Sequence, residues 1–106
     1  MDNSEKMKKL NMAIRQAEAS GMPILGLCKQ QIAILESAHD EFLSEAVSKG
    51  YNLDTNLDIL EIEIKQFSAM KQIAQKAGLP TEEFDNRIRA ARVRVLGEET
   101  VKSYFD

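Results

Sequence analysis

Two long segments with helical apolar spacing lie on either side of Gly50, and they constrain the fold more than any other feature of the chain. The first spans residues 23–49, and the second runs from about residue 54 to residue 77. Apolar residues recur every three or four positions in both segments, as in amphipathic helices. The four-residue turn at 50–53 is short enough to make the two helices antiparallel neighbours. The sequence therefore predicts a long helical hairpin.

Two shorter segments flank this hairpin. Asp2 is followed three residues later by Glu5, a pattern typical of a helix start, and helical spacing continues to about residue 20. After Thr81, similar spacing predicts a helix over residues 82–96. The remaining tail is expected to add one loose turn that docks an apolar side chain.

Glycines mark the expected helix ends, because a residue just past the last turn often takes a left-handed conformation that costs glycine nothing. Four of the five glycines stand at such places: Gly21, Gly50, Gly78 and Gly97. The second arm of the hairpin has two competing start signals, Asp54 and Thr55.

The predicted fold is all-α and forms a single domain of 106 residues. It has four helices, at about 3–20, 23–49, 54–77 and 82–96, with the two shorter helices packed at the open end of the hairpin and a short C-terminal tail. At about 1.5 Å per residue, helices of about 25 and 22 Å cover the longer arms only as far as His39 and Glu63. An apolar patch should remain exposed beyond that level.

Eight apolar residues near the hairpin turn make up the expected interaction surface: Phe42, Leu43, Val47, Tyr51, Leu53, Leu57, Ile59 and Ile62. The surrounding segment, residues 36–63, carries eight acids and one base, so its net charge is -7 although the whole chain is only at -3. Five of these acids form the expected rim: Asp40, Glu41, Glu45, Asp58 and Glu61. An apolar strip rimmed by one sign of charge is typical of a recognition surface.

These features indicate a non-enzymatic protein–protein interaction module, such as a small regulatory, adaptor or inhibitor protein. We expect it to form a homodimer, paired antiparallel so that each acidic tip lies along the basic half of the other protomer. A further protein partner would be basic or groove-bearing. The chain shows no Gly-rich phosphate loop, serine nucleophile elbow or cysteine pair, so we expect no catalytic residues and no cofactor.

A metal site is one alternative. Glu36 and His39 form a Glu-x-x-His unit, which di-iron helical bundles use to place a carboxylate and an imidazole on one helix face. A single copy is not a site, so metal binding would require a symmetric dimer, with Glu63 or Glu61 as an added ligand. A histidine on the apolar seam of the hairpin is the simpler interpretation of His39.

Nucleic-acid or phosphate binding is the other alternative, and it rests on four arginines of the last predicted helix: Arg87, Arg89, Arg92 and Arg94. On a helical wheel these arginines flank both sides of an apolar stripe, and three acids on the same helix dilute their charge. Pairing with acids of the same chain or of a dimer partner is the interpretation that we favour. Nucleic acid is therefore an unlikely partner.

Cys28 is the only cysteine, so the chain cannot form an internal disulfide, and we expect a small core residue in a cytoplasmic protein. No apolar run approaches the roughly 20 residues that a membrane-spanning helix needs, so no membrane association is expected.

Overall fold

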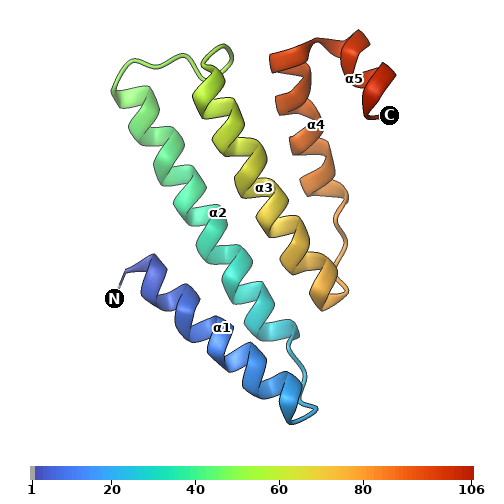
Figure 1. The fold of residues 1–106 in the computed structure, drawn as a ribbon. Helices are drawn as coiled ribbons and strands as arrows, with labels where there is room; N and C mark the ends of the chain where they lie inside the picture. The colour runs from blue at the N-terminus through green and yellow to red at the C-terminus, as the bar shows by residue number, and fades with distance from the viewer. Residues whose placement is uncertain (1) are drawn as a thin grey trace.

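The computed structural model of the chain describes residues 2–106 and contains α-helices joined by short connections (Figure 1). The five helices are α1 (Asn3–Ala19), α2 (Leu25–Ser48), α3 (Leu57–Ala77), α4 (Glu82–Leu96) and α5 (Glu98–Tyr104). The all-α prediction is thus confirmed. The predicted count of four helices is wrong, because the tail forms the seven-residue helix α5 and buries Val101 instead of adding a loose turn. None of the described helices is long and apolar enough to span a bilayer.

Glycines with positive φ stand at the helix ends, as expected from the sequence. Gly21 and Gly78 both have φ near +70°, in the left-handed region. After Gly78, the backbone N–H of Leu79 donates to the carbonyl of Ala74 at 2.8 Å, and this six-residue closure satisfies an otherwise free carbonyl of α3. The N–H of Met22 closes the end of α1 in the same way.

The start of α1 agrees with the sequence prediction, whereas the start of α3 does not. Oδ1 of Asp2 accepts the N–H of Glu5 at 2.8 Å, which caps α1. Helix α3 begins at Leu57, three residues later than predicted, because Asn56 is the residue whose Oδ1 accepts the N–H of Ile59. Upstream, Oδ1 of Asn52 accepts the N–H of residue 54 at 2.9 Å and holds the preceding residues in a turn.

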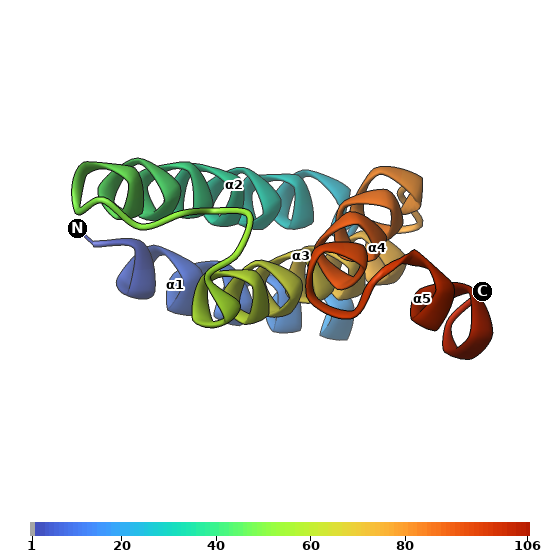
Figure 2. The same cartoon turned by 90° about the horizontal axis from the view of Figure 1, so that it is seen from above.

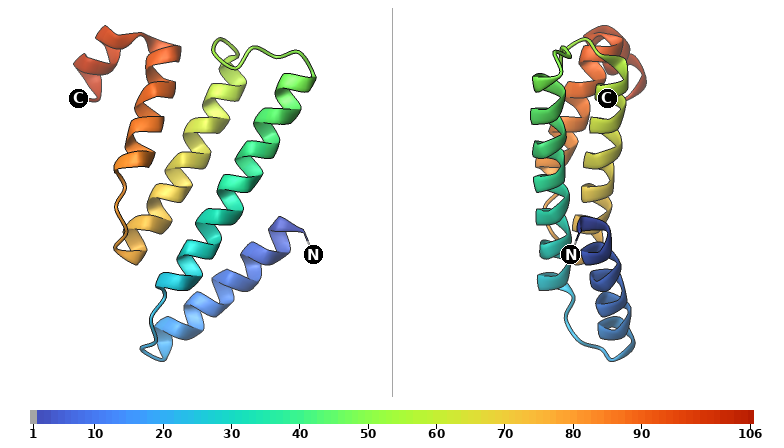
Figure 3. Two further views of the ribbon diagram at one scale, coloured as in Figure 1. Left: turned by 180° about the vertical axis from the view of Figure 1, so that it is seen from behind. Right: turned by 90° about the vertical axis from the view of Figure 1, so that its left-hand side faces the viewer.

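The helices form a flat array in which each helix packs against its neighbours in sequence. α1 lies against α2, the antiparallel pair α2–α3 forms the centre, α4 lies against α3, and α5 lies against α4 (Figure 1). The view from above places α2 in one layer and α1 and α3 in the other (Figure 2). The molecule measures 47 × 34 × 15 Å, and its thinness is visible in the side view (Figure 3).

The two short helices, α1 and α4, pack on opposite sides of the hairpin, and only α1 leaves the turn end of its side uncovered (Figure 1). α1 reaches the middle of α2, where Met7 lines the same groove as Leu35. α4 runs past Glu63, which pairs with Arg94, and its C-terminal end stands beside the start of α3 and the α2–α3 turn (Figure 1). The prediction that this helix covers the hairpin only as far as Glu63 is therefore wrong. The stretch of the hairpin without a covering helix therefore lies on the side of α1, beyond the level of Leu35.

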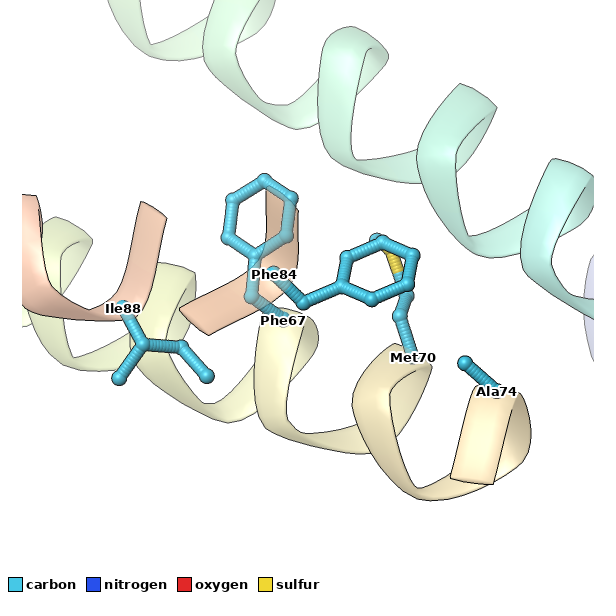
Figure 4. Close-up of a cluster of buried hydrophobic side chains, with 5 residues drawn as sticks. All are labelled: Phe67, Met70, Ala74, Phe84 and Ile88. Carbon is cyan, nitrogen blue, oxygen red and sulfur yellow. The ribbon is translucent and has the colours of Figure 1, made fainter. Parts of the chain in front are cut away.

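The main core lies between α3 and α4. Phe67, Met70 and Ala74 of α3 pack against Phe84 and Ile88 of α4, and all five side chains are at most 7% exposed (Figure 4). Ile32 and Leu35 of α2 add a partly buried edge to this cluster. Burial of each large apolar side chain contributes about 1.5–3 kcal/mol, so this cluster fixes α4 against the hairpin.

Candidate interaction surface

One face of the α2–α3 hairpin runs uninterrupted from its open end to its turn. On α2 the residues of this face are Gln31, Leu35, Phe42, Ala46 and Lys49, and on α3 they are Asp58, Ile62, Ala69, Ile73 and Lys76. Steps of three, four and seven residues keep side chains on one side of a helix. Helix α1 packs along the half of this face near the open end, and the half near the turn has no covering helix.

The uncovered half forms a concavity of about 260 Å³, which we name the tip trough. Its lining comes from the last turns of α2, the turn and the first turns of α3: Phe42, Glu45, Ala46, Lys49, Tyr51, Asn56, Asp58, Ile59 and Ile62. Ala46 and Ile59 are buried at its floor, whereas Tyr51 is 52% exposed at its edge. The trough therefore has an apolar base and a polar margin.

The structure gathers four of the eight predicted surface residues in this trough, namely Phe42, Tyr51, Ile59 and Ile62. The other four do not line it: Leu43, Val47, Leu53 and Leu57. Leu43 and Val47 each follow a trough residue by one position, which turns them about 100° around α2. Val47 and Leu57 are 58% and 64% exposed, so the apolar surface at the tip extends beyond the trough.

The predicted acidic rim is largely free of ion pairs. Asp40, Glu41, Glu45 and Asp58 are exposed and take part in no ion pair among residues 2–106. Glu61 pairs with Lys65 one turn later at 3.2 Å, in solvent. Glu45 and Asp58 stand directly on the margin of the tip trough, together with Lys49. The margin thus carries two carboxylates and one ammonium group.

Lys49, Ala46 and Asn56 belong to the trough but were not among the predicted surface residues. Ala46 stands four residues after Phe42 on the apolar stripe of α2, so the helical spacing was the signal for it. Asn56 has a second role as the cap of α3. Its position in the trough depends on the geometry of the α2–α3 turn, which cannot be predicted from the helical spacing of apolar residues.

Among residues 2–106, the three candidate metal ligands do not gather into one site. His39 is 2% exposed, and its Nδ1 is hydrogen-bonded to Oε1 of Gln66. Glu63 is buried, with Oε1 3.9 Å from Nε2 of His39, whereas Glu36 is exposed. Within residues 2–106, no group of three or more ligating side chains is close enough to hold a metal ion.

All four candidate phosphate-binding arginines have partners within the chain. Arg94 pairs with Glu63 at 3.3 Å, and Arg89 pairs with Asp106 at 2.7 Å. Arg87 pairs with an acid one turn before it and also lies 5.0 Å from the ring centre of Phe67. The guanidinium of Arg92 stacks on Phe105 at 4.2 Å. These arginines therefore tie α4 to α3, to its own first turn and to the tail.

Comparisons of the chain with protein-family models, curated proteins and solved structures return no match.

Proposed function

We propose that this protein is a non-enzymatic protein–protein interaction module, and that the tip trough binds a helix with an apolar stripe and basic flanks. The observation that carries this proposal is the face shared by α2 and α3, of which α1 covers only one half. The exposed half of this face continues the half that is buried under α1. Its composition therefore resembles that of the surface that α1 already binds. A cytoplasmic location, as expected from the lone cysteine, belongs to the same proposal.

The shape of the trough supports a helical ligand. Phe42 and Ile62 stand on two antiparallel helices, so the trough between them is elongated along the helix axes. An amphipathic helix lays side chains spaced three or four residues apart into such a groove. Apolar contact supplies most of the affinity of such complexes, because charged groups at the margin remain partly hydrated.

The charges support a basic ligand. Glu41, Glu45 and Asp58 are exposed near the trough and have no partner within residues 2–106, whereas Lys49 is the only cation on the margin. Complementary charges raise the association rate and select against acidic partners. Binding should therefore weaken as salt concentration rises, because salt screens exposed charges.

Site-specific photocrosslinking in the source cells tests this proposal. The two tyrosines of the chain offer a matched pair: Tyr51 at the trough is 52% exposed, and Tyr104 on α5 is 80% exposed. Benzoylphenylalanine at position 51 should give discrete protein adducts, and the same group at position 104 should not. Each adduct is then identified by mass spectrometry, and the purified partner is titrated against the wild-type protein.

The titration is repeated with two variants. Tyr51→Ala should weaken binding by about tenfold or more, since it removes the aromatic side chain from the edge of the trough, whereas Tyr104→Ala should leave affinity unchanged. Equal adduct yields at positions 51 and 104, or no adduct at position 51, would contradict the proposal.

A further inference from the structure

We infer that the helix bound in the tip trough is α1 of a second copy of this chain, with the partner's Met12 seated in the trough. This inference rests on the proposed function, because it names the ligand of the same surface. Each copy donates its α1 and receives the α1 of its partner, so the assembly is a two-fold symmetric dimer.

Met12 has the surroundings that the trough requires of its ligand. Its side chain is 59% exposed on the outer side of α1, and Ile14 marks the opposite, buried side. The four positions one turn before and after Met12 are occupied by Lys8, Lys9, Arg15 and Gln16. Met12 is thus an apolar side chain ringed by three cations.

No other exposed large apolar side chain of residues 2–106 has such a ring. Leu25 has one cation, Lys29, among the corresponding four positions, and Leu96 has one cation and one acid. The cations around Met12 are also available, since Lys8, Lys9 and Arg15 form no ion pair within the described part of the chain. A flexible methionine is well suited to fill an irregular apolar groove.

The charges of the two surfaces are complementary. Glu45 and Asp58 stand on the margin of the trough, and Glu41 is exposed one turn before Glu45. Three carboxylates would therefore face three cations, with apolar contact at the centre. Both surfaces belong to the same chain, so every copy carries the ligand and the receptor.

The shape of the molecule permits both contacts at once. α1 covers one half of the hairpin face (Figure 1), and the tip trough lies in the other half. A half-turn about an axis that is parallel to this face and perpendicular to the helices of the hairpin brings the α1 of each copy into the tip trough of the other. The α2 side of the trough, from Phe42 to Lys49, is about 10 Å long, and the stretch from Lys8 to Arg15 around Met12 is also about 10 Å long, so the two lengths match.

Analytical ultracentrifugation over protein concentrations from about 5 to about 300 μM measures the dissociation constant of the dimer. This range suits the weak to moderate affinity that is expected of an interface formed by two short helices. The wild-type chain should be a reversible dimer, and Met12→Asp should raise its dissociation constant by about tenfold or more. Met22→Asp is the matched control, because Met22 is equally exposed, at 61%, but lies at the α1–α2 connection. It should leave the dimer unchanged, and the circular dichroism of both variants should match the wild type.

A charge-reversal pair tests which surfaces meet. One variant carries Lys8→Glu and Lys9→Glu, and the other carries Glu41→Lys and Glu45→Lys. Each variant alone should be monomeric because like charges face each other, and an equimolar mixture should form a heterodimer in which both contacts are restored.

A wild-type chain that is monomeric up to about 300 μM would overturn this inference, and so would a dimer that is insensitive to Met12→Asp. A heterologous protein crosslinked at position 51 by a monomeric chain would leave the proposed function intact and refute only the identity of the ligand. Absence of any adduct at position 51 would instead refute the proposed function.

Discussion

Nε2 of His39 lies 3.9 Å from Oε1 of Glu63, and this contact joins the buried faces of α2 and α3. The distance is too long for a hydrogen bond, and Nε2 has no hydrogen-bond partner among residues 2–106. Glu63 is anchored instead from α4, where Nη2 of Arg94 donates to its Oε2 at 3.3 Å. A single buried carboxylate thus connects three helices.

Removal of the Glu63 carboxylate should destabilise the protein more than removal of a neighbouring exposed one. Glu63→Ala leaves Arg94 with Asp54, at 3.7 Å, as its one ion-pair partner among residues 2–106 and opens a space beside His39. We therefore expect a loss of about 1–3 kcal/mol in the free energy of unfolding. Glu61→Ala is the matched control on the same helix. Its partner Lys65 is solvent-exposed, so the loss should be below about 0.5 kcal/mol. Urea unfolding measures both, and equal losses would contradict the buried role of Glu63.

Cys28 should be unreactive in the folded protein. Its side chain is fully buried, and burial raises the pKa of its thiol above the ordinary value of 9.0, so little reactive thiolate forms at neutral pH. Labelling with a thiol reagent such as DTNB at pH 7.5 should be slow in the native state and complete in denaturant. A second cysteine introduced by Ser37→Cys, at an exposed position of α2, should label rapidly in the same sample and serves as the internal control. Rapid labelling of Cys28 would show that its surroundings open readily.

The sequence predicted the helices well because the signals for them are local. Glycines with positive φ end the helices where expected, and Asp2 caps α1 as expected. Helix length also gave the uncovered stretch beyond α1, whereas α4 reaches the turn, so the predicted limit of its coverage at Glu63 is wrong. The start of α3 was missed because Asp54, Thr55 and Asn56 are all competent caps, and only the turn geometry selects Asn56.

The packing of the helices could not be predicted in the same way, because it depends on contacts between distant residues. The apolar stripe of α2 is wide enough to accept neighbours on several sides, so spacing alone does not place α1 and α4 on opposite sides of the hairpin. Lys71 interrupts the apolar face of α3 in the sequence. In the structure its ammonium group lies 2.6 Å from the carboxylate of Asp85 on α4, and this ion pair accounts for a charged residue at that position. The composition of the tip trough likewise depends on which stripe α1 leaves uncovered.

The attachment of the tail to α4 should depend on acid pH. Nη2 of Arg89 donates to Oδ2 of Asp106 at 2.7 Å, and this hydrogen bonding holds the pKa of the Asp106 carboxyl below its ordinary value of 3.8. The pKa of this carboxyl is lower in the folded than in the unfolded protein. The contact therefore contributes stability at pH above 3.8, and this stability is lost as pH falls through the folded pKa.

Carbon-13 NMR of the Asp106 carboxyl should therefore show a titration midpoint below 3.8. Arg89→Gln should return the midpoint to its ordinary value, whereas Arg87→Gln should not change it, since Arg87 pairs with Glu83. An Asp106 midpoint that does not respond to Arg89→Gln would show that the two side chains are not paired in solution.

The cap of α3 should be required for stability at the base of the tip trough. Oδ1 of Asn56 accepts the N–H of Ile59 at 3.1 Å, and Ile59 is buried beside it, so Asn56→Ala exposes a free donor at the first turn. We expect a loss of about 1 kcal/mol in the free energy of unfolding, measured by urea denaturation. Asn56→Ser keeps a capping oxygen and should retain most of the stability. If the alanine and serine variants were equally stable, Asn56 would not be the cap, and α3 would begin at the earlier signal that the sequence also offers.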